Sequence, residues 1–134
     1  MPTKPAKIGQ SCYASGWGEV DNYCKAKELM VAPLELLGYD GCYHALKEQF
    51  MYFSRDKYQS FYERSLRWDL CASNMPKSIC EGDSGGPFTC DEYGKAVIHG
   101  ISSKILASGL QLNLKIMSFF CPIQQFLSVL RALL

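Results

Sequence analysis

The run Gly-Asp-Ser-Gly-Gly-Pro at residues 82–87 is the part of the sequence best suited to chemistry. A cysteine lies on each side of it, at Cys80 and Cys90. At average residue usage, such a run would occur by chance in a chain of this length with a probability on the order of 10⁻⁵. Gly-Asp and Ser-Gly pairs also make ordinary turns, but a turn alone does not require three glycines and a proline ordered around one serine. The pattern therefore indicates a chemical role for Ser84.

A serine in this setting suits attack on a carbonyl carbon. The attack places negative charge on the carbonyl oxygen, which needs preorganised N–H donors at about 2.7–3.1 Å. A turn at residues 82–84 can direct the backbone N–H groups of Gly82 and Ser84 at one point, and Gly82 has no side chain to obstruct the approach. Gly85 and Gly86 would let a substrate come close. The segment can thus form an oxyanion hole beside the Ser84 hydroxyl.

The surrounding sequence predicts strands in its middle and a helix at its end. Short apolar stretches bounded by Gly, Pro, Asn or Asp suit antiparallel strands; they are residues 12–17, 28–37, 87–90 and 96–102. Residues 91–95 are typical of a hairpin turn with Gly94 at positive φ. Residues 42–68 contain no Gly or Pro and predict helix. Apolar residues recur at helical spacing beyond Pro122, which suits a first helical turn.

The composition favours one disulfide-bonded domain. The chain has 134 residues, 48% of them hydrophobic, which is enough to bury a core. Its 14 basic and 13 acidic residues give a net charge of +1, so we expect neither nucleic acid nor a membrane as a partner. Seven cysteines indicate an oxidising, extracellular compartment. The first residues lack the apolar stretch of a signal peptide, and we therefore expect the natural N-terminus to lie upstream.

The segment around Ser84 resembles the active-site loop of the chymotrypsin/trypsin family of serine endopeptidases, and the rest of residues 12–134 follows the order of that family. The other segments that carry the likeness are Ser15-Gly16-Trp17-Gly18, Val31-Ala32-Pro33-Leu34, Cys42-Tyr43-His44, Leu70-Cys71-Ala72, His99-Gly100-Ile101-Ser102-Ser103 and Ser118-Phe119-Phe120-Cys121-Pro122-Ile123. The resemblance implies an all-β fold: an antiparallel six-stranded β-barrel, the second barrel of that family, with a short intermediate helix and a C-terminal α-helix. Residues 1–134 would be a partial peptidase domain, with an extended lead-in at 1–11.

The resemblance also assigns roles to individual residues. It implies that Ser84 is the nucleophile and that Gly82 and Ser84 supply the oxyanion hole. In active members, the counterpart of Asp83 pairs with a new N-terminal amine made by zymogen cleavage. Ser78 would form the floor of the specificity pocket and Ser103 would begin its wall. A serine at the floor favours apolar or aromatic substrate residues over Lys or Arg.

Two disulfides are implied by the same resemblance. They join Cys12 to Cys90 and Cys42 to Cys71, and each would stabilise the fold by roughly 3–5 kcal/mol through the unfolded chain. The remaining cysteines are Cys24, Cys80 and Cys121. The expected partner of Cys80 is missing, and a bond from it to Cys121 is left open.

The sequence departs from the family at the base and at the pocket wall. A nucleophilic serine needs a base, which in turn needs an orienting acid. The family keeps both in its first barrel, and the only histidines here, His44 and His99, lie outside those contexts. We interpret both as structural or surface residues. Lys7-Ile8-Gly9 looks like a zymogen cleavage point but lies in the linker, and Ser103-Lys104-Ile105 replaces a Ser-Trp-Gly wall.

These features set the functional prediction. The chain is expected to be the nucleophile-bearing half of a secreted serine endopeptidase that works through an acyl-enzyme, and to be inactive by itself because His and Asp are missing. Its partners would be a peptide or protein substrate, or a protein inhibitor, and the missing N-terminal barrel. No cofactor or metal is expected. The alternatives are a non-catalytic protease homologue that binds a protein, or a truncated gene product.

Overall fold

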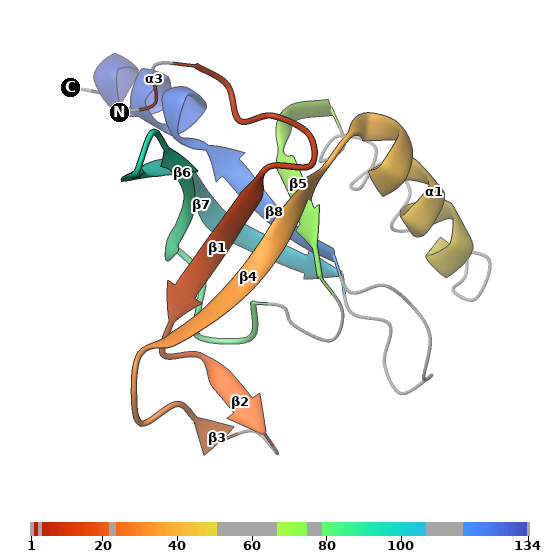
Figure 1. Ribbon diagram of the computed structural model, residues 1–134, viewed down its shortest axis with the longest axis vertical. Coiled ribbons are helices and arrows are strands. Elements are labelled where there is room, and N and C mark those ends of the chain that lie inside the picture. The colour runs from red at the N-terminus through yellow and green to blue at the C-terminus, as the bar shows by residue number, and fades with distance from the viewer. Residues whose placement is uncertain are drawn as a thin grey trace.

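Six strands close into an antiparallel barrel in the order β1-β4-β5-β8-β7-β6. The computed structural model describes residue 2 and residues 4–21, 24–50, 67–74, 79–106 and 117–133. The barrel strands are β1 (Ser11–Gly16), β4 (Met30–Leu37), β5 (Leu70–Ser73), β6 (Pro87–Glu92), β7 (Lys95–Leu106) and β8 (Met117–Pro122). A two-stranded ribbon of β2 (Glu19–Asp21) and β3 (Cys24–Lys25) projects from one end of the barrel (Figure 1). The predicted six-stranded antiparallel barrel is confirmed.

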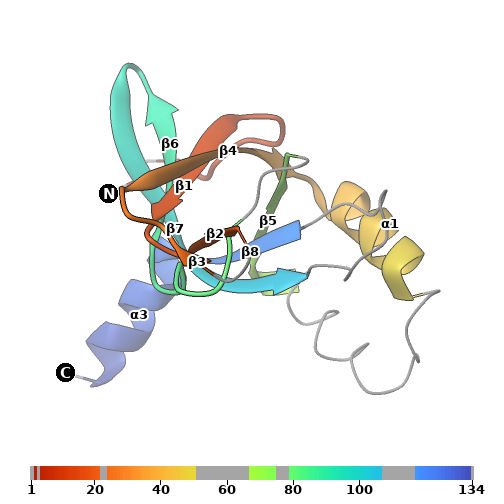
Figure 2. The same cartoon turned by 90° about the horizontal axis from the view of Figure 1, so that it is seen from below.

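Two helices flank the barrel on different sides (Figure 2). The first, α1 (Tyr39–Phe50), follows β4, and the second, α3 (Ile123–Leu133), follows β8 and packs on β7 and β8. The helix predicted at 42–68 begins three residues earlier than expected, and its stretch 51–66 lies outside the described residues. Pro122 ends β8 directly before α3, so it precedes the helix instead of lying in its first turn. None of the described helices is long and apolar enough to span a membrane.

The core lies inside the barrel and follows the two-residue period of the strands. In β1 the buried side chains are Cys12 and Ala14, two positions apart, because successive side chains of a strand point to opposite faces. The rings of Phe88 and Phe120 stack with their centroids 4.2 Å apart, and both side chains are fully buried. A Cβ added at Gly100 would lie 2.9 Å from the Phe120 Cβ, so this strand position needs glycine.

The structure contains both disulfides that the family resemblance implies. Cys12 and Cys90 face each other in register across β1 and β6, where these strands close the barrel, with a Cα separation of 4.2 Å. The second bridge joins α1 to β5, with a Cα separation of 6.5 Å between Cys42 and Cys71. Cys80 is a free, partly buried thiol and is therefore not bonded to Cys121.

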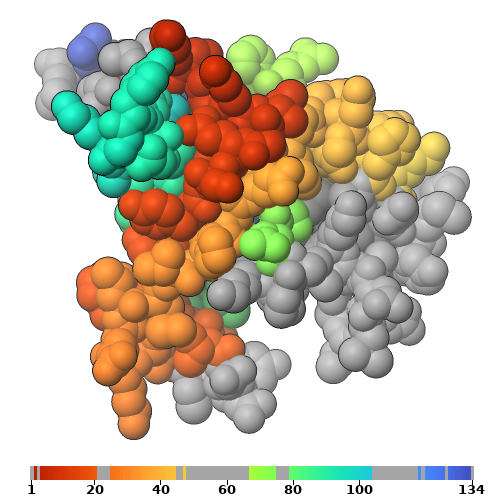
Figure 3. Space-filling model, in the orientation of Figure 1, coloured from red at the N-terminus to blue at the C-terminus, as the bar shows by residue number. Residues whose placement is uncertain are grey.

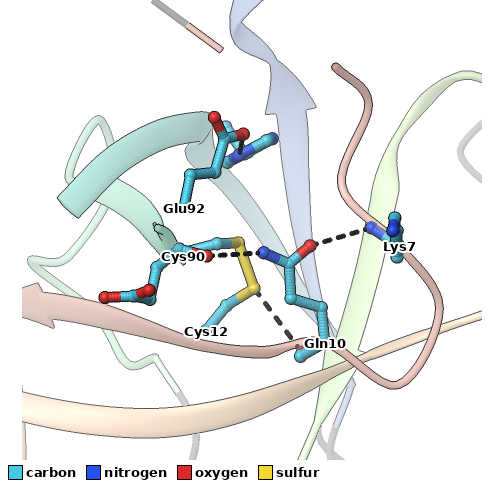
Figure 4. The surroundings of a disulfide bond; sticks show 7 residues. Lys7, Gln10, Cys12, Cys90 and Glu92 are labelled. Carbon is cyan, nitrogen blue, oxygen red and sulfur yellow. Dashed lines mark hydrogen bonds and ion pairs between the residues drawn. A yellow bond between two sulfur atoms is a disulfide. The ribbon is translucent and has the colours of Figure 1, made fainter. Parts of the chain in front are cut away.

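The lead-in is tied to the barrel beside the Cys12–Cys90 bridge (Figure 4). A turn brings the Gln10 N–H to the Lys7 carbonyl at 3.0 Å, with Gly9 at a φ of 76°. The Gln10 amide accepts a hydrogen bond from the Lys7 N–H at 2.9 Å and donates one to the Asp91 carbonyl at 3.0 Å. The Gln10 side chain thus ties the lead-in to the hairpin of β6 and β7.

Candidate active site

Residues 80–86, here called the serine loop, form two consecutive turns before β6 begins. The Asp83 N–H donates to the Cys80 carbonyl at 3.1 Å, and the Gly86 N–H donates to the Asp83 carbonyl at 3.0 Å. Gly82 and Gly85 have φ values of 93° and 82°, a region that residues with a Cβ rarely adopt. Residues 82–84 therefore lie where the two turns, at 80–83 and 83–86, meet at Asp83, instead of forming a single turn of their own, and backbone conformation accounts for two glycines of the loop.

The serine loop is anchored to β7 on one side. The Gly85 N–H donates to the Ser102 carbonyl at 2.9 Å, and the Ser102 N–H donates to the Gly86 carbonyl at 2.8 Å. The register with β8 shifts at the next residue, Ser103, and such a bulge re-aims the strand locally. Ser103 is exposed and lies one residue from this anchor, whereas Ser78, the other predicted pocket residue, lies outside the described residues.

Asp83 points away from the surface and into the turn that follows β1. Its Oδ1 accepts a hydrogen bond from the Gly18 N–H at 2.8 Å, and its Oδ2 accepts one from the Cys80 N–H at 2.9 Å. A Cβ added at Gly18 would lie 2.5 Å from the Asp83 carboxyl carbon, and one at Gly16 would also meet this carboxylate. The glycines of the Ser-Gly-Trp-Gly segment therefore leave room for the Asp83 carboxylate. Sequence reasoning identified this segment but missed its contact with Asp83.

The start of the β2–β3 ribbon holds the serine loop on its other side. The Glu19 N–H donates to the Glu81 carbonyl at 2.9 Å. The Gly18 carbonyl in turn accepts the Ala26 N–H at 3.0 Å, just beyond β3. Figure 3 shows the ribbon as a lobe that extends below the barrel. Gly18 and Glu19 thus hold the serine loop through two hydrogen bonds, one to the Asp83 side chain and one to the Glu81 carbonyl.

The Ser84 side chain is exposed at the surface of this loop. Among the described residues, no hydrogen bond acceptor receives the N–H of Gly82 or of Ser84, although Asp83, Gly85 and Gly86 all donate theirs. The two donors expected for an oxyanion hole are therefore, with the Glu81 N–H, among the N–H groups of the loop that have no acceptor in the described residues. Their position on either side of Asp83 follows from the two turns that share this residue.

A pocket of about 300 Å³ lies behind the serine loop, on the side of the Asp83 carboxylate. The turn after β1, the start of β4 and Ile79 line it, with Glu19 as a second carboxylate. Ser84 is not among its lining residues, so this cavity is separate from the surface where the hydroxyl is exposed.

Neither histidine contacts Ser84 within the described residues. His44 is exposed on α1, which follows the far end of β4, while the serine loop lies near the Gly16–Met30 pair at the other end. His99 is 4% exposed, and its Nε2 lies 2.7 Å from the Glu92 Oε1, although the ring N–H is not aimed at that oxygen. Across the part of the chain that the structure describes, no group of three or more His, Cys, Asp or Glu residues could hold a metal ion.

Comparison with known proteins matches this arrangement to one family. The trypsin family matches residues 1–130. Kallikrein 1-related peptidase b5 and kallikrein-1, both of Mus musculus, are 35% identical to the chain over 107 residues, and kallikrein-2 of Homo sapiens is 33% identical over 107 residues. Each match covers 77% of this chain but 34% of the relative, so the chain spans about a third of the length of these proteins. The chain belongs to the trypsin family.

Proposed function

We propose that this chain is the nucleophile-bearing half of a chymotrypsin-like serine endopeptidase. The observation that carries the proposal is the serine loop, which exposes the Ser84 hydroxyl beside two N–H groups that have no acceptor among the described residues. The Ser84 Oγ would attack a peptide carbonyl and form an acyl-enzyme, with the Gly82 and Ser84 N–H groups binding the oxygen that becomes negative. One such donor is worth about 10²–10³ in kcat in enzymes of this type.

The base is assigned to another part of the parent protein. Ser84 must lose its proton as the new bond forms, and an imidazole oriented by a carboxylate takes it in this mechanism. His44 lies at the other end of the barrel, and the His99 ring is buried beside Glu92. The relatives are about three times as long as the matched region, which leaves room in such proteins for a barrel that carries the missing His and Asp.

The pocket behind the serine loop is proposed as the site of activation. Its volume of about 300 Å³ and the Asp83 carboxylate suit the aliphatic N-terminal residue and the amine that zymogen cleavage releases. Cleavage at Lys7–Ile8 would not supply this amine, because the adjoining Gly9 N–H is bonded to the Leu36 carbonyl, at the opposite end of β1 from Asp83. The amine is therefore assigned to a residue outside this chain.

The substrate is proposed to be a peptide or protein with an apolar or aromatic residue before the cleaved bond. Ser78 and Ser103 would form the floor and wall of the pocket for that residue, and a protein inhibitor could occupy the same surface. We place the protein in the extracellular space, because its two disulfides suit an oxidising compartment.

The test compares the oxidised chain alone with the chain mixed with the first-barrel half of mouse kallikrein-1. An aromatic ester and a fluorophosphonate probe measure turnover and serine labelling, with Ser84→Ala as the matched control. We expect neither turnover nor rapid labelling from the chain alone, and Ser84-dependent labelling when the two halves associate. Rapid labelling of the chain alone would mean that His44 or His99 serves as the base. Association of the halves without labelling would contradict the proposed nucleophile.

A second candidate is a non-catalytic protease homologue that binds a protein through the same face. Lys104 favours it, because this position carries tryptophan in the pocket wall of the family. The natural sequence upstream of Met1 separates the candidates: a barrel with His and Asp in their family contexts selects the enzyme, and a barrel without them selects the binding protein.

A further inference from the structure

Residues 91–94, here called the hairpin tip, carry a tyrosine that their turn does not favour. Only Tyr93 and Gly94 connect the end of β6 to the start of β7, and their φ values are 55° and 76°. A two-residue turn of this kind needs positive φ at both positions and prefers Asn, Asp or Gly at the first. Tyr93 is therefore held in a conformation that a residue with a Cβ disfavours. Formation of the turn does not explain why this residue is a tyrosine.

Packing does not explain Tyr93 either. Its side chain is 91% exposed, more than any other exposed large hydrophobic side chain among the described residues. By comparison, Tyr39 is also exposed, but its ring stacks on that of Tyr43 within α1, with the centroids 6.1 Å apart. A residue that opposes its backbone preference and adds nothing to the core indicates a function outside the fold.

The hairpin presents Tyr93 to other macromolecules. Figure 2 shows the hairpin of β6 and β7 extending past the rest of the barrel. The two strands stay paired up to the tip, where Glu92 lies opposite Lys95. The Asp91 Oδ1 accepts the Gly94 N–H at 3.0 Å and closes the turn. An enzyme can therefore reach the phenol of Tyr93 without any separation of the strands.

Charged side chains of both signs surround the hairpin tip. Asp91 and Glu92 directly precede Tyr93, so two carboxylates lie beside the phenol in sequence. A pocket of about 210 Å³ is lined by these three residues and, from the lead-in, by Lys4 and Lys7. No ion pair joins the lysines to the carboxylates within the described part of the chain. A basic enzyme cleft would thus meet the carboxylates, and an anion added to the phenol would have the two lysines across the pocket.

We propose that Tyr93 is a site of O-sulfation by a transferase of the secretory pathway that uses a phosphosulfate donor. The phenol oxygen attacks the sulfur of the donor, and the bond from that sulfur to the phosphate oxygen breaks. The phenol proton passes to a base of the transferase, and the products are a tyrosine sulfate ester and a phosphate, with no change of oxidation state. Sulfate is assigned in preference to phosphate because the two disulfides suit the oxidising compartment in which tyrosine is sulfated. The inference rests on the proposed extracellular location, but not on the proposed catalysis.

The test incubates the full, oxidised chain with Golgi membranes, which supply the transferase, and a radiolabelled phosphosulfate donor. Peptide mapping then locates the label, which we expect on Tyr93. Tyr93→Phe removes only the phenol oxygen and should abolish that label. Tyr39→Phe makes the same change at another exposed tyrosine and should leave the label in place. Label on a different tyrosine, or label that appears only after the disulfides are reduced, would overturn the inference.

A second variant tests recognition through the two carboxylates. Asp91→Asn combined with Glu92→Gln removes both charges but keeps the oxygens that lie against the Gly94 N–H and the His99 ring. Incorporation should slow by about tenfold, at the low end of electrostatic steering. An unchanged rate would refute recognition through the acidic side chains of the hairpin tip.

Expression in secreting cells separates sulfate from phosphate. Chlorate blocks formation of the phosphosulfate donor, so it should remove the mass of one SO₃ group from the peptide that contains Tyr93. A modification that persists in chlorate and is removed by a phosphatase would overturn the assignment to sulfate. Ser84→Ala should be labelled as fast as the parent chain. Absent label together with active reconstituted halves would overturn this inference alone, whereas labelled Tyr93 with inactive halves would count against the enzyme proposal alone.

Discussion

Substitution of Gly18 by alanine should destabilise the chain far more than its position outside the strands suggests. The added Cβ would lie 2.5 Å from the Asp83 carboxyl carbon and 2.6 Å from its Oδ1, which is closer than van der Waals contact allows. The φ of Gly18 is outside the left-handed region, so the backbone itself accepts alanine. The whole effect must therefore come from displacement of the Asp83 carboxylate.

The expected loss follows from the bonds that this displacement breaks. The carboxylate accepts the Gly18 and Cys80 N–H groups, and a hydrogen bond to a charged group contributes about 1.5–3 kcal/mol. Asp83 is only half-buried, so water recovers part of this energy, and we expect a loss of about 2–4 kcal/mol. With an m value of about 2 kcal/mol/M in urea, the unfolding midpoint would fall by about 1–2 M.

Gly41→Ala is the matched control, because among the described residues a Cβ there meets the Leu37 Cβ, at the end of β4, at 3.7 Å, which is an ordinary contact. The same chemical change should stabilise α1 by about 0.5–1 kcal/mol. We expect the losses of stability in Gly18→Ala and Asp83→Ala to be strongly non-additive, because Gly18→Ala has little left to displace once the carboxylate is gone. A Gly18→Ala chain within about 0.5 kcal/mol of the parent would refute this account of the Ser-Gly-Trp-Gly segment.

Two further predictions concern the disulfides and the β6–β7 hairpin. For sequence separations of 78 and 29, loop entropy gives a stabilisation of about 4.5 kcal/mol for Cys12–Cys90 and about 3.6 kcal/mol for Cys42–Cys71. The variant with both cysteines of the first bridge changed to serine should therefore unfold at a lower urea concentration than the corresponding variant of the second bridge. The reverse order would contradict the entropy argument. Tyr93 is 91% exposed at a φ of 55°, so Tyr93→Asn should stabilise the chain by about 1 kcal/mol in thermal unfolding, and a loss of stability would reveal packing by this ring.

Much of the fold could be predicted because its signals are local or belong to the family. Short apolar stretches bounded by Gly, Pro, Asn or Asp indicated the strands, and the family resemblance predicted that these strands close into a barrel. The start of α1 was missed because Gly41 argues against helix, whereas the Gly38 carbonyl accepts the Cys42 N–H at 3.0 Å and begins the helix earlier. Gly94 was expected at positive φ, but a two-residue hairpin turn requires this of both central residues, which includes Tyr93.

The contacts that hold the serine loop could not be predicted from the sequence. Gly18 and Asp83 are separated by 65 positions, and no spacing rule links them. The hydrogen bond from the Glu19 N–H to the Glu81 carbonyl joins backbone atoms, so the identity of neither side chain signals it. The motif around Ser84 indicated which atoms could react. Only the three-dimensional arrangement shows that the β2–β3 ribbon orients them.

The two disulfides also determine where the strands of the barrel can separate transiently. The ring of strands closes between β1 and β6, and the Cys12–Cys90 bond seals that seam. Any transient opening must therefore begin at another seam, and β5, with four residues, is the shortest barrel strand. Because Cys71 binds β5 to Cys42 in α1, a parted β5 takes this helix with it. In the oxidised chain, a strand and a helix would thus swing out as one unit, while the strands next to Ser84 remain in place.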